Sequence, residues 1–188
     1  MSYVQRRRFL WVLFLAGLVL LAIAANATTL VRLQFFQLVQ NSSAVARLRC
    51  ADTQTRLEGG EIWTDWVFDV VQFDKGYLPS RVVVRTPGGV YEHLHSHVDG
   101  VPEFHPGEEV FLFLAGRPGF PFRIVGWTQG TFRIRRNGMS GLETVTQDSA
   151  GVPVFDPETR QFVKTGIRDL RMDLFLEKLN KEIHRQAL

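Results

Sequence analysis

The chain has 188 residues, 45% of them hydrophobic and 22% charged, a composition that excludes wholesale disorder and allows one compact domain with additions. Its formal net charge is +3, and Arg6, Arg7 and Arg8 account for it, because the other 19 basic residues are matched by 19 acidic ones. A domain without net charge has no general attraction to phosphate backbones, so we expect no nucleic-acid partner.

The first 27 residues have the three parts of a signal peptide. A basic start is followed by an apolar run over residues 9–25, and residues 25–27 (ANA) fit a cleavage site that would leave Thr28 as the mature N-terminus. Residues 22–24 (AIA) offer a second cleavage site. Residues 6–10 (RRRFL) fit a twin-arginine motif, but the strongly apolar run favours the ordinary Sec route.

The same segment also fits an uncleaved membrane anchor. Residues 9–31 carry no charge, and about 20 apolar residues suffice to span a bilayer. Both interpretations leave the arginines in the cytoplasm and place the rest of the chain outside it. We therefore expect an exported protein that is periplasmic, secreted or associated with the cell envelope, and that contacts a membrane only through this segment if it is retained.

A short helix is predicted over residues 34–40, where Phe35, Leu38 and Val39 recur with helical spacing. It is followed by a long antiparallel hairpin over residues 43–73, because period-two alternation continues on both sides of a Gly-Gly turn. Each arm is longer than the usual strand of about 5–6 residues, so we expect the hairpin to bend or to contain a bulge.

Alternation assigns the hairpin side chains to two faces. The face predicted to be apolar is formed by Ala44, Ala46, Leu48, Cys50, Ile62, Trp66, Phe68 and Val70. The opposite face is formed by Arg47, Arg49, Thr53, Trp63, Asp65 and Asp69. Cys50, the single cysteine, is therefore expected to be a buried thiol that behaves as a small hydrophobic residue.

The remaining pattern predicts further strands and one C-terminal helix. Strands are expected over residues 81–85, 109–114, 122–127 and 131–135, with short strands near 143–146 and 152–155. The strand over residues 109–114 is almost entirely apolar and should be covered on both faces. A helix is predicted over residues 170–186, with its apolar stripe formed by Leu170, Leu174, Leu179 and Ile183.

These elements predict a mainly β protein: a small antiparallel OB-like barrel or sandwich with a short N-terminal helix and a C-terminal amphipathic helix. The expected organisation has four parts. They are a leader over residues 1–27, a β-barrel domain over residues 28–136, an irregular excursion with short strands over residues 137–167, and a helix over residues 168–188.

The strongest candidate for chemistry is a histidine-rich loop around residues 90–105. In extended backbone His93, His95 and His97 would point the same way, and imidazole rings bind zinc or copper. A metal site at these three residues is one interpretation. The other is a polar, solvated loop that holds no metal.

No catalytic residues are predicted, because the chain contains no G-x-S-x-G and no H-E-x-x-H motif. Asp65 and Asp69 share one strand face and could form a carboxylate pair, but the solvent-facing side of the hairpin is the simpler interpretation. Trp63 and Tyr77 are candidate exposed aromatic residues for a partner surface.

Several segments together resemble a known group of proteins. They are residues 43–49 (SAVARLR), residues 61–70, Lys75-Gly76 and residues 106–114 (PGEEVFLFL). This pattern resembles uncharacterised exported bacterial proteins and, more distantly, the netrin/TIMP-like module, an OB-type barrel. Inhibitors of the TIMP type chelate a protease zinc through an N-terminal cysteine, whereas Thr28 is expected here and one cysteine forms no internal disulfide. The inhibitory mechanism is therefore not transferred.

The sequence thus favours an exported, non-enzymatic binding or interaction module, without a required cofactor, that recognises an unidentified extracytoplasmic protein or ligand. The alternatives are a metal-binding protein that uses the three histidines and a protease-inhibitor-like module.

Overall fold

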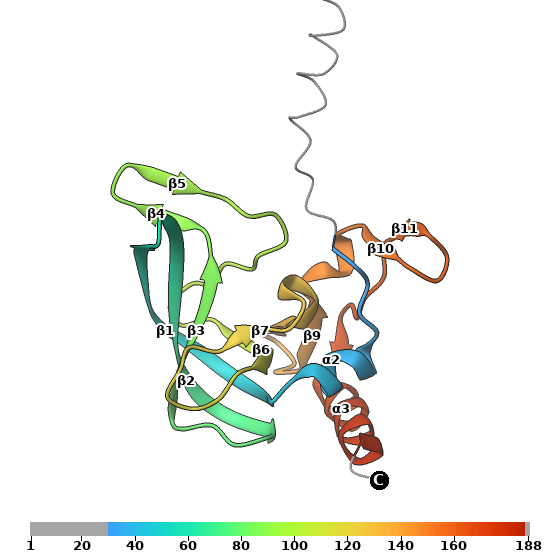
Figure 1. Ribbon diagram of the computed structural model, residues 1–188. Coiled ribbons are helices and arrows are strands. Elements are labelled where there is room, and N and C mark those ends of the chain that lie inside the picture. The colour runs from blue at the N-terminus through green and yellow to red at the C-terminus, as the bar shows by residue number, and fades with distance from the viewer. Residues whose placement is uncertain (1–29, 187–188) are drawn as a thin grey trace, which may run out of the picture.

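The computed structural model describes residues 30–186, so the expected signal peptide or anchor lies outside the described residues. Over this range the protein is mainly antiparallel β, with one short helix near the start and one longer helix at the end (Figure 1). No helix in the described range is both long and apolar enough to cross a membrane.

The elements follow one another as bounded here. The helices are α2 (Phe35–Asn41) and α3 (Met172–Gln186), and two short 3-10 turns are η1 (Trp127–Gly130) and η2 (Asp148–Gly151). The strands are β1 (Ala44–Glu58), β2 (Glu61–Lys75), β3 (Arg81–Pro87), β4 (Gly89–Tyr91), β5 (Leu94–Ser96), β6 (Glu109–Ala115), β7 (Arg123–Ile124), β8 (Thr131–Arg136), β9 (Glu143–Gln147), β10 (Val154–Asp156), β11 (Gln161–Val163) and β12 (Leu170–Arg171).

The main sheet has the strand order β12-β9-β8-β6-β1-β2-β3, with β7 paired to β6. Two small hairpins, β4–β5 and β10–β11, stand apart from it. The paired strands leave β12 and β3 at the ends of an open path, so the sheet is not the closed barrel expected from the sequence. Because β9 and β12 extend this sheet, residues 143–147 pair directly with the strand that precedes them.

The sheet nevertheless curls until its β3 edge meets the chain just before β7. Phe122 forms a parallel bridge with Val84, and its N–H and carbonyl group bond to Val83 and Arg85 over 2.8 Å each. The contact stops there, because the preceding Pro121 has no N–H to extend a ladder.

The β1–β2 hairpin contains the predicted irregularity, and one bulge lies near the middle of β1. Cys50 pairs with Phe68 but Asp52 pairs with Val67, so Ala51 is an extra residue on β1. A one-residue bulge moves all following side chains to the opposite face.

This bulge corrects one sequence prediction. Simple alternation from Arg49 places Thr53 on the outer face, but Thr53 lies opposite Trp66 and Thr55 lies opposite Thr64, on the inner face. The far part of the hairpin, between the bulge and the Gly59-Gly60 turn, therefore presents Thr53 and Thr55 on the inner face, where uninterrupted alternation would place Gln54 and Arg56.

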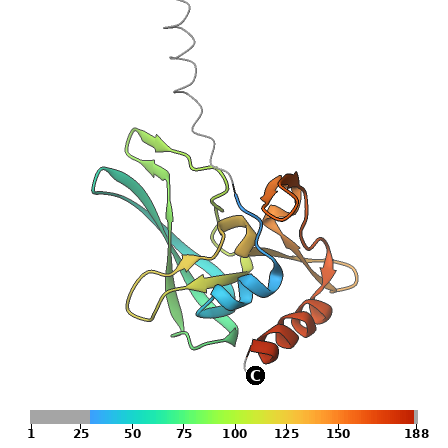
Figure 2. The same ribbon diagram turned by 45° about the vertical axis from the view of Figure 1, so that its right-hand side comes forward.

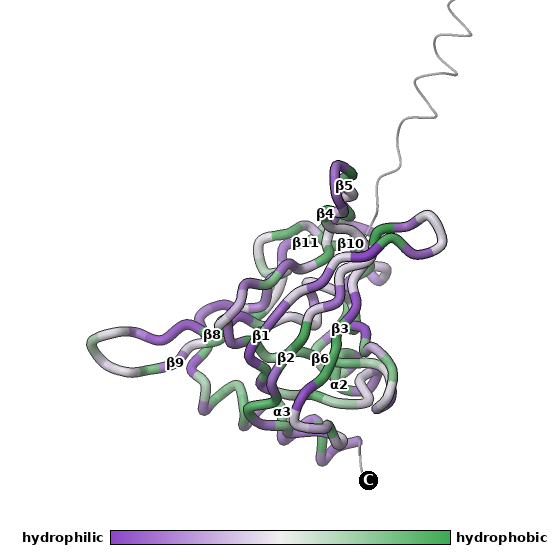
Figure 3. Tube along the Cα trace, turned by 90° about the vertical axis from the view of Figure 1, so that its left-hand side faces the viewer, coloured by the Kyte–Doolittle hydropathy of each residue, from purple (hydrophilic) through white to green (hydrophobic). Residues whose placement is uncertain are grey.

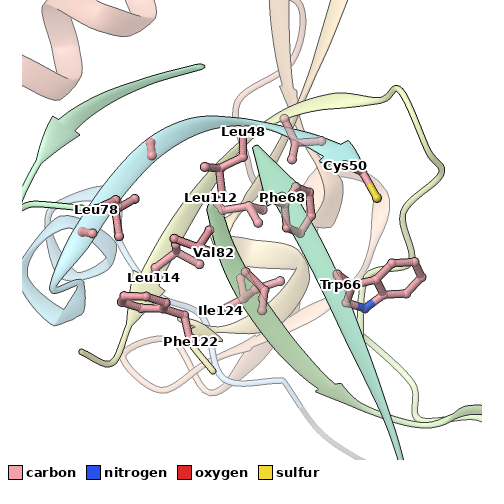
Figure 4. Packing of buried hydrophobic residues seen from close by; sticks show 14 of the residues in the cluster. Leu48, Cys50, Trp66, Phe68, Leu78, Val82, Leu112, Leu114, Phe122 and Ile124 are labelled. Atoms are coloured by element: carbon pink, nitrogen blue, oxygen red, sulfur yellow. The ribbon is translucent and has the colours of Figure 1, made fainter. Parts of the chain in front are cut away.

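The first hydrophobic core fills the inside of the curl (Figure 4). It consists of Ala44, Ala46, Leu48, Cys50, Trp66, Phe68, Leu78, Val82, Val84, Phe104, Val110, Leu112, Leu114, Phe122 and Ile124. We call the part of the hairpin between the open ends of its strands and the bulge the near part. The apolar face predicted for this near part is therefore confirmed. Cys50 is buried as expected and lies in this core with Trp66.

The second core lies on the other side of the sheet and is covered by the two helices (Figure 2). Its buried members are Leu38, Val39, Val45, Phe111, Phe113, Phe132, Val145, Phe175 and Leu179. β6 serves both cores, since Leu112 belongs to the first while Phe111 and Phe113 belong to the second. The predicted double-sided burial of this strand is confirmed.

Three element predictions are corrected. The expected strand over residues 122–127 is reduced to β7, because the left-handed Gly126 (φ 64°) starts the η1 turn. The predicted strand over residues 152–155 is β10, which begins only at Val154. Leu174 is 45% exposed: the helix begins at Met172, and its buried stripe is centred on Phe175 and Leu179.

Figure 3 shows how hydropathy follows this architecture. Hydrophobic residues gather where β2, β6 and α2 lie, while the projecting β8–β9 hairpin is largely hydrophilic. That hairpin turns at Asn137, whose Oδ1 accepts hydrogen bonds from the N–H groups of Met139 and Ser140.

Candidate functional site

A pocket of about 240 Å³ opens beside the far part of the β1–β2 hairpin. One wall is the inner face of β1, β2 and β3 beyond the bulge, and the other is the segment that leaves β3, forms β4–β5 and returns through residues 96–103. Its lining includes the five hydroxyl residues Thr53, Thr55, Thr64, Thr86 and Ser96.

Two of the hydroxyl groups are fixed by buried hydrogen bonds. The Trp66 indole N–H donates to Thr86 Oγ1 over 2.9 Å, and the Thr64 hydroxyl donates to the Gly88 carbonyl over 2.7 Å. Thr55 Oγ1 lies 3.3 Å from Thr64 Oγ1, which links the two hairpin arms. The polar wall is therefore held in one geometry by the strands themselves.

The Gly88-Gly89 pair allows the chain to pass close to this wall. Both residues have positive φ, and a Cβ on Gly89 would lie 2.3 Å from Thr64 Oγ1. A Cβ on Gly88 would lie 2.8 Å from the Ser96 carbonyl oxygen. Glycine is required at both positions because other residues are strained in this backbone conformation and would collide with the wall.

The chemistry of the pocket is that of a polar, mostly uncharged binding site. Hydroxyl groups both donate and accept hydrogen bonds, so they suit a ligand that carries hydroxyl or amide groups. His97 and Glu103 stand among the lining residues, while Trp66, Val101 and Pro102 provide apolar surface. An apolar floor with a few fixed polar groups is the usual composition of small-molecule sites.

The structure places the three predicted metal ligands along the neighbouring β4–β5 hairpin. His93 lies in its turn, His95 on β5 and His97 just beyond it, and all three are exposed. The turn at His93 interrupts the extended backbone that the prediction requires. Within residues 30–186 no group of three His, Cys, Asp or Glu side chains is placed to hold a metal ion. Metal binding by this loop in solution stays a prediction.

Asp65 and Asp69, the predicted carboxylate pair, bind different arginines. Asp65 accepts two hydrogen bonds from Arg85, over 2.7 and 3.0 Å, and lies 2.7 Å from an Arg56 nitrogen. Asp69 accepts a hydrogen bond from Arg81 over 2.8 Å. Each carboxylate thus has its own guanidinium partner. Asp69 is on the solvent-facing side as predicted, whereas Asp65 is only 4% exposed and is buried under its arginine partners.

A second ion-pair network crosses the sheet at the near part of the hairpin. Arg47 donates two hydrogen bonds to Glu143 over 2.9 Å each and one to Glu109 over 2.7 Å. Arg136 also donates to Glu143, over 2.7 Å. The hydrogen bonds from Arg47 have the largest effect on Glu143 and lower its pKa. Burial opposes them, the hydrogen bond from Arg136 adds to them, and the pKa falls from 4.5 to about 2. The network joins β1, β6, β8 and β9 and is a structural feature.

Cys50 has the environment of an unreactive thiol. Its side chain is buried in the first core, and burial raises the pKa of its thiol, an effect reinforced by the charges of Glu108 and Asp52. A reactive thiol needs a lowered pKa and solvent access. The environment of Cys50 is the opposite of that of a nucleophile.

The two candidate aromatic residues differ in exposure. Tyr77 is 72% exposed in the β2–β3 loop and packs its ring edge-to-face against Phe73, with centroids 6.2 Å apart. Trp63 is only half-exposed on the outer face of β2, where it pairs across the ladder with Pro87.

Comparison with known proteins gives no further guide. No family model matches the chain, and neither a curated protein nor a solved structure matches it.

Sequence reasoning did not find the threonine-lined pocket. The signal was present in the spacing of Thr53, Thr55 and Thr64 on either side of the hairpin turn, but without the bulge at Ala51 the two arms assign them to different faces. Thr86 gave no signal at all, since its role depends on the tertiary contact with Trp66.

Proposed function

We propose that this protein is an exported, non-enzymatic binding module and that its ligand is a small, uncharged molecule rich in hydroxyl groups, such as a saccharide unit, held in the threonine-lined pocket. The observation that carries the proposal is the pocket wall, which five hydroxyl residues line together with Trp66.

The strand arrangement supports this proposal. The order β3-β2-β1-β6-β7, with Phe122 returning to β3, is similar to the five-stranded, partly open OB-type barrel. Proteins of that type bind oligonucleotides or oligosaccharides on the face of their second and third strands. Thr64, Trp66 and Thr86 line the pocket from β2 and β3. Because the chain after residue 27 carries no net charge, the saccharide is favoured over the oligonucleotide.

The test is a titration with a panel of mono- and oligosaccharides, followed by NMR through the indole N–H signal of Trp66. That proton lies in the pocket wall and is hydrogen-bonded to Thr86, so an occupied pocket should shift its resonance. Thr55→Leu should weaken binding by about tenfold or more, since it removes a hydroxyl group and fills space in the pocket.

The matched control is Thr144→Leu on β9. Thr144 is a half-exposed strand threonine like Thr55, but it lies outside the pocket, so this substitution should leave the affinity unchanged. If no saccharide shifts the Trp66 signal, or if the two variants bind equally well, the proposal is wrong.

A further inference from the structure

The described chain begins in an extended segment, residues 30–33, that is tightly fixed to the fold through an isolated β-bridge between Val31 and Phe155. The Phe155 N–H donates to the Leu30 carbonyl and the Arg32 N–H donates to the Phe155 carbonyl, each over 2.8 Å. Arg32 also forms an ion pair with the buried Asp156 over 2.6 Å. The position of Leu30 relative to the β10–β11 hairpin is therefore set by backbone and side-chain bonds together.

A buried glutamine holds the same segment from its other side. Gln129, which is 3% exposed, accepts a hydrogen bond from the Leu33 N–H over 2.7 Å and donates one to the Val31 carbonyl over 2.8 Å. Residues 30–33 are therefore held against the domain along their whole length, and the chain is fixed from Leu30 onward.

Residues 9–29, which precede this segment, carry no charge. About 20 apolar residues cross a bilayer, so this run is long enough to do so. Leu30 and Val31 follow this run directly and already belong to the fixed segment. If the run spans a bilayer, the domain has no linker and its face around Leu30 must lie at the membrane surface.

Two hairpins flank Leu30 on this face. A Cβ on Gly100, a few residues after β5, would lie 2.6 Å from Leu30 Cδ1, so the Leu30 side chain packs against the β4–β5 side. Its backbone is bonded to Phe155 of β10. Figures 1 and 2 both show these hairpins at the end of the molecule where the described chain begins, with α3 at the opposite end.

Large apolar side chains are exposed on both hairpins. Phe162 on β11 is 62% exposed, Val90 and Leu94 on β4–β5 are 53% and 42% exposed, and Val31 between them is 50% exposed. Arg160 and Lys164, both exposed, lie two residues before and two residues after Phe162 in the sequence, and the exposed Glu158 lies four residues before it. Apolar side chains with basic neighbours are typical of surfaces that insert into the headgroup region of a membrane.

We propose that residues 9–29 are retained as a membrane anchor and that the face formed by the β4–β5 and β10–β11 hairpins rests on the outer surface of that bilayer. Phe162 and Leu94 then insert among the lipid headgroups on either side of the anchor. The partner of this face is a lipid surface, and the saccharide pocket is not needed for the contact.

The experiment uses the full chain with its leader, reconstituted in phosphatidylcholine vesicles that carry a nitroxide on the headgroup. Phe162→Cys is labelled with an environment-sensitive fluorophore, and the native Cys50 stays unlabelled in the folded protein because it is buried. Leu94→Cys is the second variant, and it keeps the test decisive if Phe162→Cys does not fold. Tyr77→Cys is the matched control, since it replaces an exposed aromatic residue in the β2–β3 loop at the other end of the molecule.

We expect the nitroxide to quench the labels at positions 162 and 94 at least threefold more strongly than the label at position 77. Equal quenching at the three positions would overturn the proposal. An intact mass showing that the protein in the cell envelope begins at Thr28 would also overturn it, because the anchor would then be absent. Neither result bears on saccharide binding, which is read separately through Trp66.

Discussion

The two parts of the β1–β2 hairpin are made from the same two strands but serve different purposes. Before the bulge at Ala51, β1 buries Ala46, Leu48 and Cys50 in the first core. Beyond it, the same face of the hairpin presents Thr53 and Thr55 to the pocket, and the strands stand out from the core.

The difference shows how one inserted residue divides a hairpin into a part that faces the first core and a part that faces the pocket. Near the core, alternation places arginines outside and aliphatic residues inside. The bulge reverses the alternation on β1 alone, so the inner face continues with hydroxyl residues while Arg56 joins Asp65 on the outer face. Bulges commonly redirect side chains in this way near binding sites.

The largest expected effect contrasts one leucine from each part. Leu48→Ala should lower the free energy of unfolding by about 2–5 kcal/mol, because it leaves a cavity in the first core. Leu57→Ala should change it by no more than about 0.5 kcal/mol, since that side chain is 45% exposed near the hairpin turn. Urea denaturation of both variants measures the difference, and similar losses would show that the two parts are equally structural.

The second prediction concerns the ion pairs on the outer face of the near part, where Arg47 binds Glu143. The pKa of Glu143 is lowered to about 2, so its ionised form contributes stability that is fully present above pH 4.5 and is lost as the pH falls toward 2. Each pKa unit corresponds to about 1.4 kcal/mol, so Glu143→Gln should remove up to about 3 kcal/mol at pH 7. The deficit should shrink as the pH is lowered from 4.5 to 2, as followed by urea denaturation.

The exposed Glu177 on α3 supplies the control for this measurement. Glu177→Gln should change the stability by no more than about 0.5 kcal/mol. A deficit in Glu143→Gln that stays constant between pH 7 and pH 2 would contradict the role assigned to the Arg47–Glu143 pair.

The smallest expected effect lies in the far part. Thr86→Val should cost about 1–3 kcal/mol, because it leaves the buried Trp66 indole N–H without its acceptor. In a Trp66→Phe background the same substitution should cost less, since no donor is then left unpaired. Equal costs in the two backgrounds, measured by thermal or urea unfolding, would show that the Trp66–Thr86 hydrogen bond does not matter for stability.

Much of the fold was predictable because its signals are local. The Gly-Gly turn with alternation on both arms predicted β1 and β2, and the apolar run over residues 109–114 predicted a strand buried on both faces. Helical spacing predicted α2 and α3, although Leu174 was assigned to the buried stripe and is exposed. The predicted closed barrel was wrong. Closure requires a ladder between the two edges of the sheet, and here the β3 edge meets the chain before β7 only through the isolated bridge between Val84 and Phe122.

The pocket was not predictable because its parts come from separate segments and depend on the register of one bulge. The histidine row was predicted from extended backbone, but the turn at His93 breaks that geometry. By itself the sequence determined the long hairpin, the strand over residues 109–114, the two helices within a few residues of their ends and the burial of Cys50, since each depends on neighbours along the chain. The tertiary structure alone decided which face carries the threonines and which two hairpins flank Leu30, because these depend on pairing register and on contacts between residues far apart in sequence.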